Sequence, residues 1–218
     1  MSCTICEIRK EKRFCPALHG RICAPCCGEQ REVTLDCPSD CPYLIQARQH
    51  EKPRPLTDLD QSKLFPAVEI GDQFIYEHEH LLVGLSFALA KAIQKDRTIN
   101  DADLLAALGS LAGSYETLVN SGLHYEAART SLSQQAVATE IQEMLKQYRE
   151  TEEKHIGYSR LRDSEVLRAL VFLLRMGFAH TNGRPKSRAY VDFVLGQFPE
   201  KQSAIATPEE AGNRIIVP

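Results

Sequence analysis

The chain has 218 residues, of which 43% are hydrophobic and 25% are charged, a composition that is typical of a folded globular protein and excludes a low-complexity chain. The formal net charge is −3 at pH 7, which excludes nucleic-acid binding through overall charge, so such a function would need local basic patches. All eight cysteines lie within residues 3–41, and this clustering predicts a small metal-bound module at the N-terminus.

The cysteine-rich segment contains metal-ligand pairs at short spacings. A Cys-x2-Cys step lets a short turn direct two sulfurs at one ion, and a structural zinc ion takes four such donors in a tetrahedron. Four pairs therefore predict two zinc ions, bound in sequential or in interleaved order. The nine candidate ligands are the pairs Cys3 with Cys6, Cys15 with His19, Cys23 with Cys26 and Cys37 with Cys41, together with Cys27.

Interleaving would join the first pair to the third and the second pair to the fourth. That order resembles the cross-brace of RING and B-box zinc fingers, and the resemblance includes Ile5 inside the first pair and Pro38 directly after Cys37. It covers less than a fifth of the chain and implies a compact zinc-stapled unit. The last pair has three intervening residues and the chain has no Trp, so ubiquitin-ligase activity is implied only as an analogy. The whole chain also resembles a group of bacterial proteins with a Cys-rich zinc-finger head and a helical C-terminal domain, which implies no activity.

The identity of the eighth ligand stays open between Cys27 and His19. With Cys27, every thiol binds an ion, and we favour this solution because thiolates bind zinc strongly. With His19, the order is closer to that of a RING, and Cys27 is left free.

Disulfides, an iron–sulfur cluster and free or redox-active thiols compete with zinc. Residues 1–20 are polar and charged, so we expect no signal peptide, no membrane span and a cytoplasmic location, where thiols stay reduced. An iron–sulfur cluster needs four thiolates and would leave four cysteines unexplained.

The chain divides into four predicted parts. Pro53 and Pro55 lie in a polar stretch that is typical of a linker. The parts are a Cys-rich zinc-binding module at 1–47, a linker at 48–63, an all-α domain at 64–199 and a flexible tail at 200–218.

Apolar residues recur at helical spacing from about Phe65 onwards, and no strand alternation of useful length occurs there. We therefore predict an all-α bundle of about five helices. Residues 166–178 are apolar nearly all round, which predicts a central buried helix. The first helix is predicted to end near Asp96. The second is capped by Asn100 with Asp103 and stops at Ser121–Gly122, and the third starts at Ser131 or Ser133. The fourth is capped by Asp163 and ends at Asn182–Gly183, and a short fifth helix runs up to Pro199.

Some polar residues of the bundle resemble a di-metal site. Glu-x-x-His steps place both side chains on one helix face, and ferritin-like bundles use two such steps with two further glutamates. We interpret most of these residues instead as solvated charges, and His78 as a core histidine. The candidates are Glu77 with His80, Glu152 with His155, Glu116 and Glu140.

Two short basic segments are candidates for contact with phosphate or nucleic acid. A solvated turn explains the second segment equally well. The cations are Arg9, Lys10, Lys12 and Arg13 in the first segment and Arg184, Lys186 and Arg188 in the second.

Together these features predict a cytoplasmic, non-enzymatic zinc-binding interaction or adaptor protein that recognises another macromolecule, foremost a protein. One alternative is a nucleic-acid-binding regulator. Another is an enzyme, either ubiquitin-ligase-like or a bundle metalloenzyme.

Overall fold

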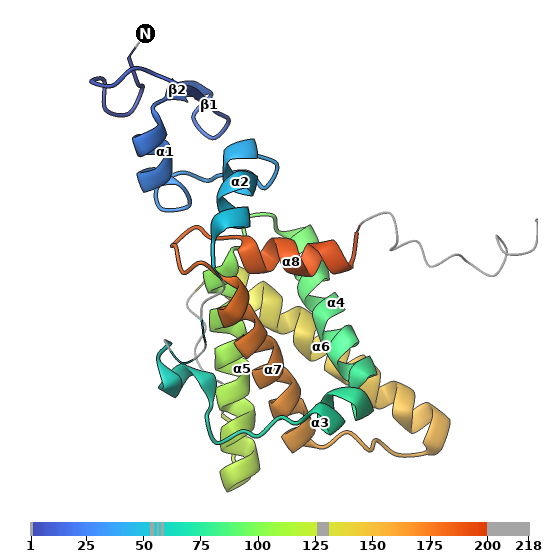
Figure 1. Cartoon of the computed structure of the whole chain (residues 1–218). Coiled ribbons are helices and arrows are strands. Elements are labelled where there is room, and N and C mark those ends of the chain that lie inside the picture. Colours follow the sequence, from blue (N-terminus) through green and yellow to red (C-terminus); the bar gives the residue numbers. More distant parts are fainter. Residues whose placement is uncertain (1, 53–54, 56, 58, 126–130, 200–218) are drawn as a thin grey trace, which may run out of the picture.

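The computed structural model describes residues 2–52, 55, 57, 59–125 and 131–199, and this part of the chain is mostly helical (Figure 1). It contains eight α-helices and one small two-stranded sheet within these ranges. The predicted helical fold with a separate cysteine cluster is confirmed in this coarser form. The predicted tail at 200–218 lies outside the described residues.

Residues 2–50, here called the head, hold all the cysteines. Strand β1 (Arg13–Cys15) pairs antiparallel with β2 (Gly20–Ile22), with Arg13 opposite Ile22 and Cys15 opposite Gly20. Helix α1 (Ala24–Gln30) starts directly after Cys23, and α2 (Pro42–His50) starts directly after Cys41. A proline in the first turn of each helix fits a position where the missing N–H costs nothing.

The core of the head consists mainly of cysteine side chains. Ile22 and Leu35 are the aliphatic residues that are buried among them. Such a small apolar cluster offsets little of the entropy of ordering some fifty residues.

The following segment lies on the helical part, which we define as residues 61–197. After the 3-10 turn η2 (Gln61–Leu64), the guanidinium of Arg175 donates to the carbonyls of Leu64, Phe65 and Val68 at 2.7–2.9 Å. These bonds hold the chain against α7 (Asp163–His180) before the first long helix begins.

The described residues of the helical part form six helices where the sequence predicted about five, so the predicted count is not confirmed. The first predicted helix is divided at His78 into α3 (Asp72–Glu77) and α4 (Glu79–Lys95). His78 has φ −113° and ψ 24°, which interrupts the helix although the apolar spacing continues through it. The other helices are α5 (Asp101–Ser121), α6 (Leu132–Ile156) and α8 (Ala189–Gln197).

Most predicted helix ends are confirmed by hydrogen bonds. Asn100 and Asp103 form the predicted capping box at the start of α5, and Gly122 ends that helix in the left-handed conformation. Ser131, and not Ser133, caps α6 by accepting from the Gln134 N–H at 3.1 Å. The predicted cap at Asp163 is wrong by one residue, because Asp163 is the first residue of α7 and the N-cap position is Arg162, whose N–H donates to Glu165 at 2.9 Å.

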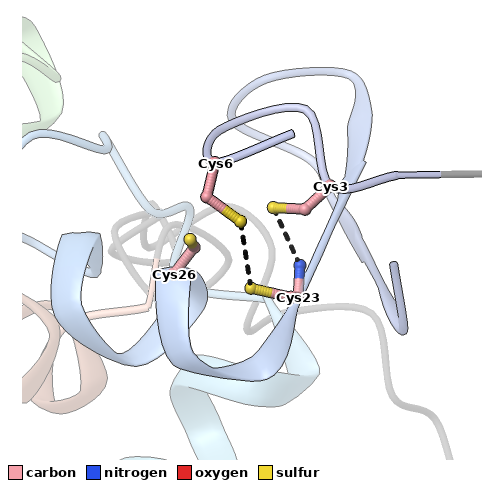
Figure 2. A group of neighbouring side chains, drawn as sticks. All are labelled: Cys3, Cys6, Cys23 and Cys26. Atoms are coloured by element: carbon pink, nitrogen blue, oxygen red, sulfur yellow. Dashed lines mark hydrogen bonds between the residues drawn. The ribbon is translucent and has the colours of Figure 1, made fainter. Parts of the chain in front are cut away.

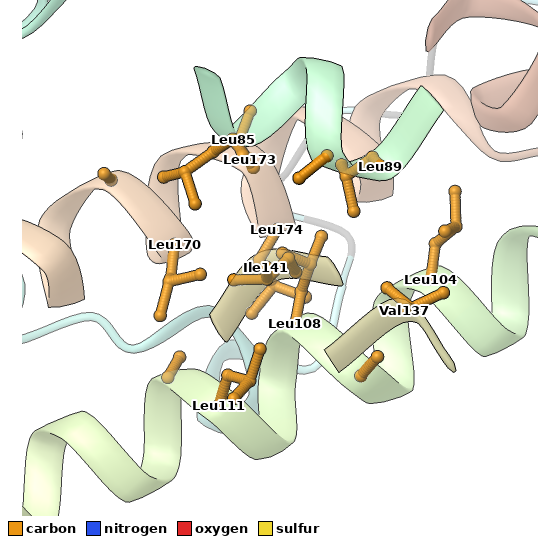
Figure 3. Close-up of a cluster of buried hydrophobic side chains, with 14 of the residues drawn as sticks. Leu85, Leu89, Leu104, Leu108, Leu111, Val137, Ile141, Leu170, Leu173 and Leu174 are labelled. Carbon is orange, nitrogen blue, oxygen red and sulfur yellow. The ribbon is translucent and has the colours of Figure 1, made fainter. Parts of the chain in front are cut away.

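The apolar faces of four long helices meet in one core (Figure 3). Helix α5 packs mainly against α7, and α4 packs mainly against α6. The central burial predicted for 166–178 is confirmed, because α7 buries residues on nearly every side. Burial of each leucine-sized side chain stabilises the fold by about 1.5–3 kcal/mol. The labelled core residues are Leu85, Leu89, Leu104, Leu108, Leu111, Val137, Ile141, Leu170, Leu173 and Leu174.

A buried carboxylate fixes the start of α8 to the helical core. Asp101 is 1% exposed and accepts hydrogen bonds from Ser187 Oγ at 2.6 Å and from the N–H groups of Tyr190 and Val191 at 3.1 and 3.0 Å. The hydroxyl of Tyr190 donates to the Leu173 carbonyl at 3.0 Å. The turn before α8 is therefore held from the bundle side by directional bonds.

This arrangement predicts a large stability loss for Asp101→Ala. The substitution leaves two buried backbone N–H groups without an acceptor, at a cost of about 1–3 kcal/mol each. We expect a loss of about 2–4 kcal/mol in the free energy of unfolding, measured in urea. Asp101→Asn keeps an acceptor oxygen and should lose less, whereas equal stability of Asp101→Ala and the parent chain would contradict this role.

Candidate metal centre

Four cysteines form a compact group in the head (Figure 2). The sulfurs of Cys3, Cys6, Cys23 and Cys26 all lie within 4.8 Å of one another, and three of the four residues are fully buried. The Cys6 and Cys23 sulfurs are 4.0 Å apart. Tetrahedral zinc with bonds of about 2.3 Å places its sulfurs about 3.8 Å apart, so these four side chains could hold a metal ion.

Local backbone bonds place each pair. The Cys3 N–H donates to the Arg9 carbonyl at 2.9 Å and the Glu7 N–H donates to the Cys3 carbonyl at 2.8 Å, which closes a tight turn around the first pair. Glu7 has φ 56°, a left-handed conformation that is uncommon for residues other than glycine and that this closed turn requires. The second pair begins just before α1, and the Cys23 N–H donates to the Cys3 sulfur at 3.2 Å.

The environment already favours thiolate at some of these sulfurs. Burial opposes ionisation of Cys3, but hydrogen bonds from the backbone of Cys6, Cys23 and Ile5 together lower its pKa to about 6. The side-chain hydrogen bond with Cys23, together with burial, raises the pKa of Cys26 to about 12. A cation at the centre would favour the thiolate form of all four sulfurs.

Arg9 lies beside the same sulfurs. A side-chain hydrogen bond with Cys23 raises the pKa of its guanidinium, and the charges of Cys6 and Cys26 act in the same direction. A dication held by four thiolates has a net charge of about −2, so a neighbouring arginine partly neutralises the site. The sequence assigned Arg9 to a basic nucleic-acid segment, and its place beside the sulfurs could not be seen from spacing alone.

The remaining thiols lie together in a second region of the head. Cys15, Cys27, Cys37 and Cys41 line one small cavity, which Ile22, Leu35 and Leu44 also line. Burial raises the pKa of Cys37, and the charges of Glu32, Cys15 and Cys41 add to this effect. In the described ranges, however, the one group of three or more ligand atoms within 4.8 Å of one another is Cys3, Cys6, Cys23 and Cys26.

His19 lies elsewhere. It is exposed on the turn between β1 and β2, has φ 48°, and is not part of the cavity lining. The structure therefore separates the two candidates for the eighth ligand, with Cys27 among the other thiols and His19 outside them.

The Glu-x-x-His residues of the helical part do not form a ligand group among the described residues. Glu140 pairs with Lys91 and Lys95 instead. Glu152 accepts from the N–H groups of Arg160 and Leu161 and thereby orders the turn after α6. His78 is half-buried, stacks near Phe74 and lies 4.0 Å from Glu165, whereas His80 and His155 are exposed.

The second basic segment faces the head. Arg184 Nη1 donates to the carbonyls of Gly28 and Arg31 at 3.2 and 2.6 Å. Lys186 Nζ donates to the Thr34 carbonyl at 3.0 Å and to Asp36 at 2.8 Å. Arg188 Nη1 instead donates to the carbonyls of Arg97 and Ile99 in the loop between α4 and α5.

Glu32 is a polar centre that the sequence analysis missed. Its side chain is 1% exposed and accepts from Arg48 Nη2 at 2.9 Å and from Asn182 Nδ2 at 2.7 Å. Its carbonyl accepts from the Lys186 N–H at 2.8 Å, and Arg48 also pairs with Asp192 at 2.5 Å. A single glutamate in a charged stretch carries no periodic signal of burial, so only the tertiary structure shows it.

Comparisons with known proteins give no match to a family model, to a curated protein or to a solved structure.

None of the helices in the described segments is both long enough and apolar enough to cross a membrane.

The four-cysteine group predicts a specific response to loss of one sulfur. We expect Cys6→Ser to weaken metal binding at this site by more than the roughly 10- to 100-fold that a lost supporting hydrogen bond costs. Metal content after dialysis, measured by mass spectrometry, checks this. Thr4→Ser is the matched control, because it keeps the hydroxyl that donates to the Arg21 carbonyl at 2.7 Å. Equal metal content in both variants would rule out Cys6 as a ligand.

Proposed function

We propose that this chain is a cytoplasmic, non-enzymatic zinc protein whose head presents a recognition surface to another protein. The observation that carries the proposal is the buried group of Cys3, Cys6, Cys23 and Cys26. Four protein sulfurs fill a tetrahedral shell and leave no position for a substrate or water, which is characteristic of a structural and not a catalytic ion.

The donor chemistry supports zinc. Thiolates select zinc, copper(I) or iron–sulfur clusters, and a compact four-sulfur site in a reduced compartment is typical of structural zinc. Metal binding would also account for the folding of the head, whose apolar core is too small to fold it alone.

We propose a second zinc ion bound by Cys15, Cys27, Cys37 and Cys41. The support is their common cavity, which the exposed His19 does not line. With this set the ligands of the two sites alternate along the chain. Cys15 lies between the pairs Cys3–Cys6 and Cys23–Cys26 of the first site, and the other ligands of the second site follow Cys26. The order then resembles a cross-brace in which Cys27 takes the place of His19.

The head offers apolar side chains that its own core does not use. Ile8 is 88% exposed and Phe14 is 53% exposed. Ile8 lies in the metal turn between Cys6 and Arg9, so its position depends on the metal site. Exposed aliphatic and aromatic side chains on a rigid turn are the usual anchors of a protein interface.

The zinc proposal predicts two ions per chain, measured by mass spectrometry on protein purified without added metal. Cys27→Ala should reduce the stoichiometry from two towards one, because it removes a ligand of the second site. His19→Ala should leave two ions in place. The opposite result for this pair would assign the eighth ligand to His19, and one ion or none in the parent chain would disprove the two-ion proposal.

The recognition proposal predicts that Ile8→Glu reduces capture of a binding protein from cell extract by at least about tenfold, as expected for a buried anchor residue. Leu132→Glu is the control, because Leu132 is 90% exposed on α6 and is not part of the head. Capture should also be lost when a chelator removes zinc. Equal loss in both variants, or capture that survives chelation, would contradict recognition by the head.

A further inference from the structure

We infer that metal binding in the head and docking of the head on the helical part are thermodynamically coupled, so that each strengthens the other. The link is the segment 28–36, here called the docking loop. The inference rests on the proposed zinc binding, and it adds a regulation of the metal sites by residues that touch no metal.

The docking loop lies between proposed ligands. Cys26 and Cys27 precede it and Cys37 follows it. Within the loop, Leu35 is the apolar side chain that is buried in the head core. Its turn is closed by the N–H groups of Val33, Thr34 and Leu35, which all donate to the Gln30 carbonyl at 3.1–3.2 Å. One buried leucine cannot offset the ordering entropy of nine residues, so the fixed ends must supply the difference.

The folded loop presents acceptors to the helical part. The carbonyls of Gly28 and Arg31 accept from Arg184, and the carbonyl of Thr34 accepts from Lys186. These carbonyls face the helical part together as long as the loop keeps this conformation. A loop released from the metals would turn them to water, and the cations would lose their partners.

The receiving segment, 181–188, has internal hydrogen bonds and bonds to the helical core in addition to its bonds to the head. Asn182 Oδ1 accepts from the Arg184 N–H at 2.9 Å, and the Ser187 N–H donates to the Arg184 carbonyl at 3.0 Å. Asp101 holds Ser187 from the core side. We therefore expect the helical part to keep this surface when the head is released, so that the order of the docking loop decides whether the surface is occupied.

Glu32 makes the coupling strong. It is the buried residue of the docking loop that joins Arg48 of α2 to Asn182 of the helical part, and it has φ 52°. A buried carboxylate that loses one partner is costly, so Glu32 favours either the docked state or full release into water. Any free energy that docking gives to the folded loop appears, by linkage, as tighter metal binding.

The first test measures zinc affinity in the full-length protein by competition with a chelator of known affinity. The double variant Arg184→Ala/Lys186→Ala changes no metal ligand, yet we expect it to weaken zinc binding by about 5- to 100-fold, the usual range of coupling between sites. The control is Lys146→Ala/Lys154→Ala, which removes the same charge from α6. Circular dichroism should confirm the same helix content in both.

The second test needs no substitution. Amide hydrogen exchange is followed in the parent chain with zinc and with excess chelator. The Lys186 N–H, which donates to the Glu32 carbonyl, should lose protection when zinc is removed. The N–H groups of Tyr190 and Val191, which donate to Asp101, should keep theirs.

The outcomes separate the two proposals. If the parent chain binds two zinc ions but both double variants bind them equally tightly, the coupling is wrong and the zinc proposal stands. If Lys186 stays protected after chelation, docking does not depend on metal and the coupling is again wrong. A parent chain that binds no zinc would overturn both.

Discussion

The rest of this structure depends on how the head replaces an apolar core. Its buried side chains are mostly cysteines, with Ile22 and Leu35 between them. Neutral thiols in contact contribute little more than small apolar groups. A cation bound between them would add strong bonds to their thiolate forms. The residues that give an empty head only a small core would therefore stabilise a metal-bound one.

Arg9 and the cations at 184–188 show how charge in a sequence can be misread. Both segments look like surfaces for phosphate, because a run of cations is visible and its partners are not. In the structure Arg9 lies beside the thiols, and Arg184 and Lys186 donate to carbonyls of the head. Arginine suits such carbonyl contacts because its planar group donates in several directions. Fewer of its N–H groups then remain for an external anion.

The sequence predicts those features whose signal is local. The capping box at Asn100, the stop at Gly122 and the buried sides of α7 follow from spacing and residue type, and the structure has them. The ligand spacing likewise indicates the group around Cys3. By contrast, the break at His78 and the burial of Glu32 and Asp101 are set by tertiary contacts. No periodicity in the chain marks these carboxylates as buried. Their partners are distant in sequence, namely Arg48 and Asn182 for Glu32 and Ser187 for Asp101.

The contact between the head and the helical part is polar, and this polarity affects the free energy of separating them. Their hydrophobic clusters are distinct, and the bonds between them are made by Glu32, Arg184, Lys186 and the Arg48–Asp192 pair. Directional bonds to carbonyls fix one docking geometry, since a shift of one residue leaves buried groups unpaired. Yet when all of them open together, each group can be solvated, and no large apolar surface is exposed to water. Such a contact combines a defined docked state with a low cost of complete release, whereas a hydrophobic contact of the same extent would hold the two parts together permanently.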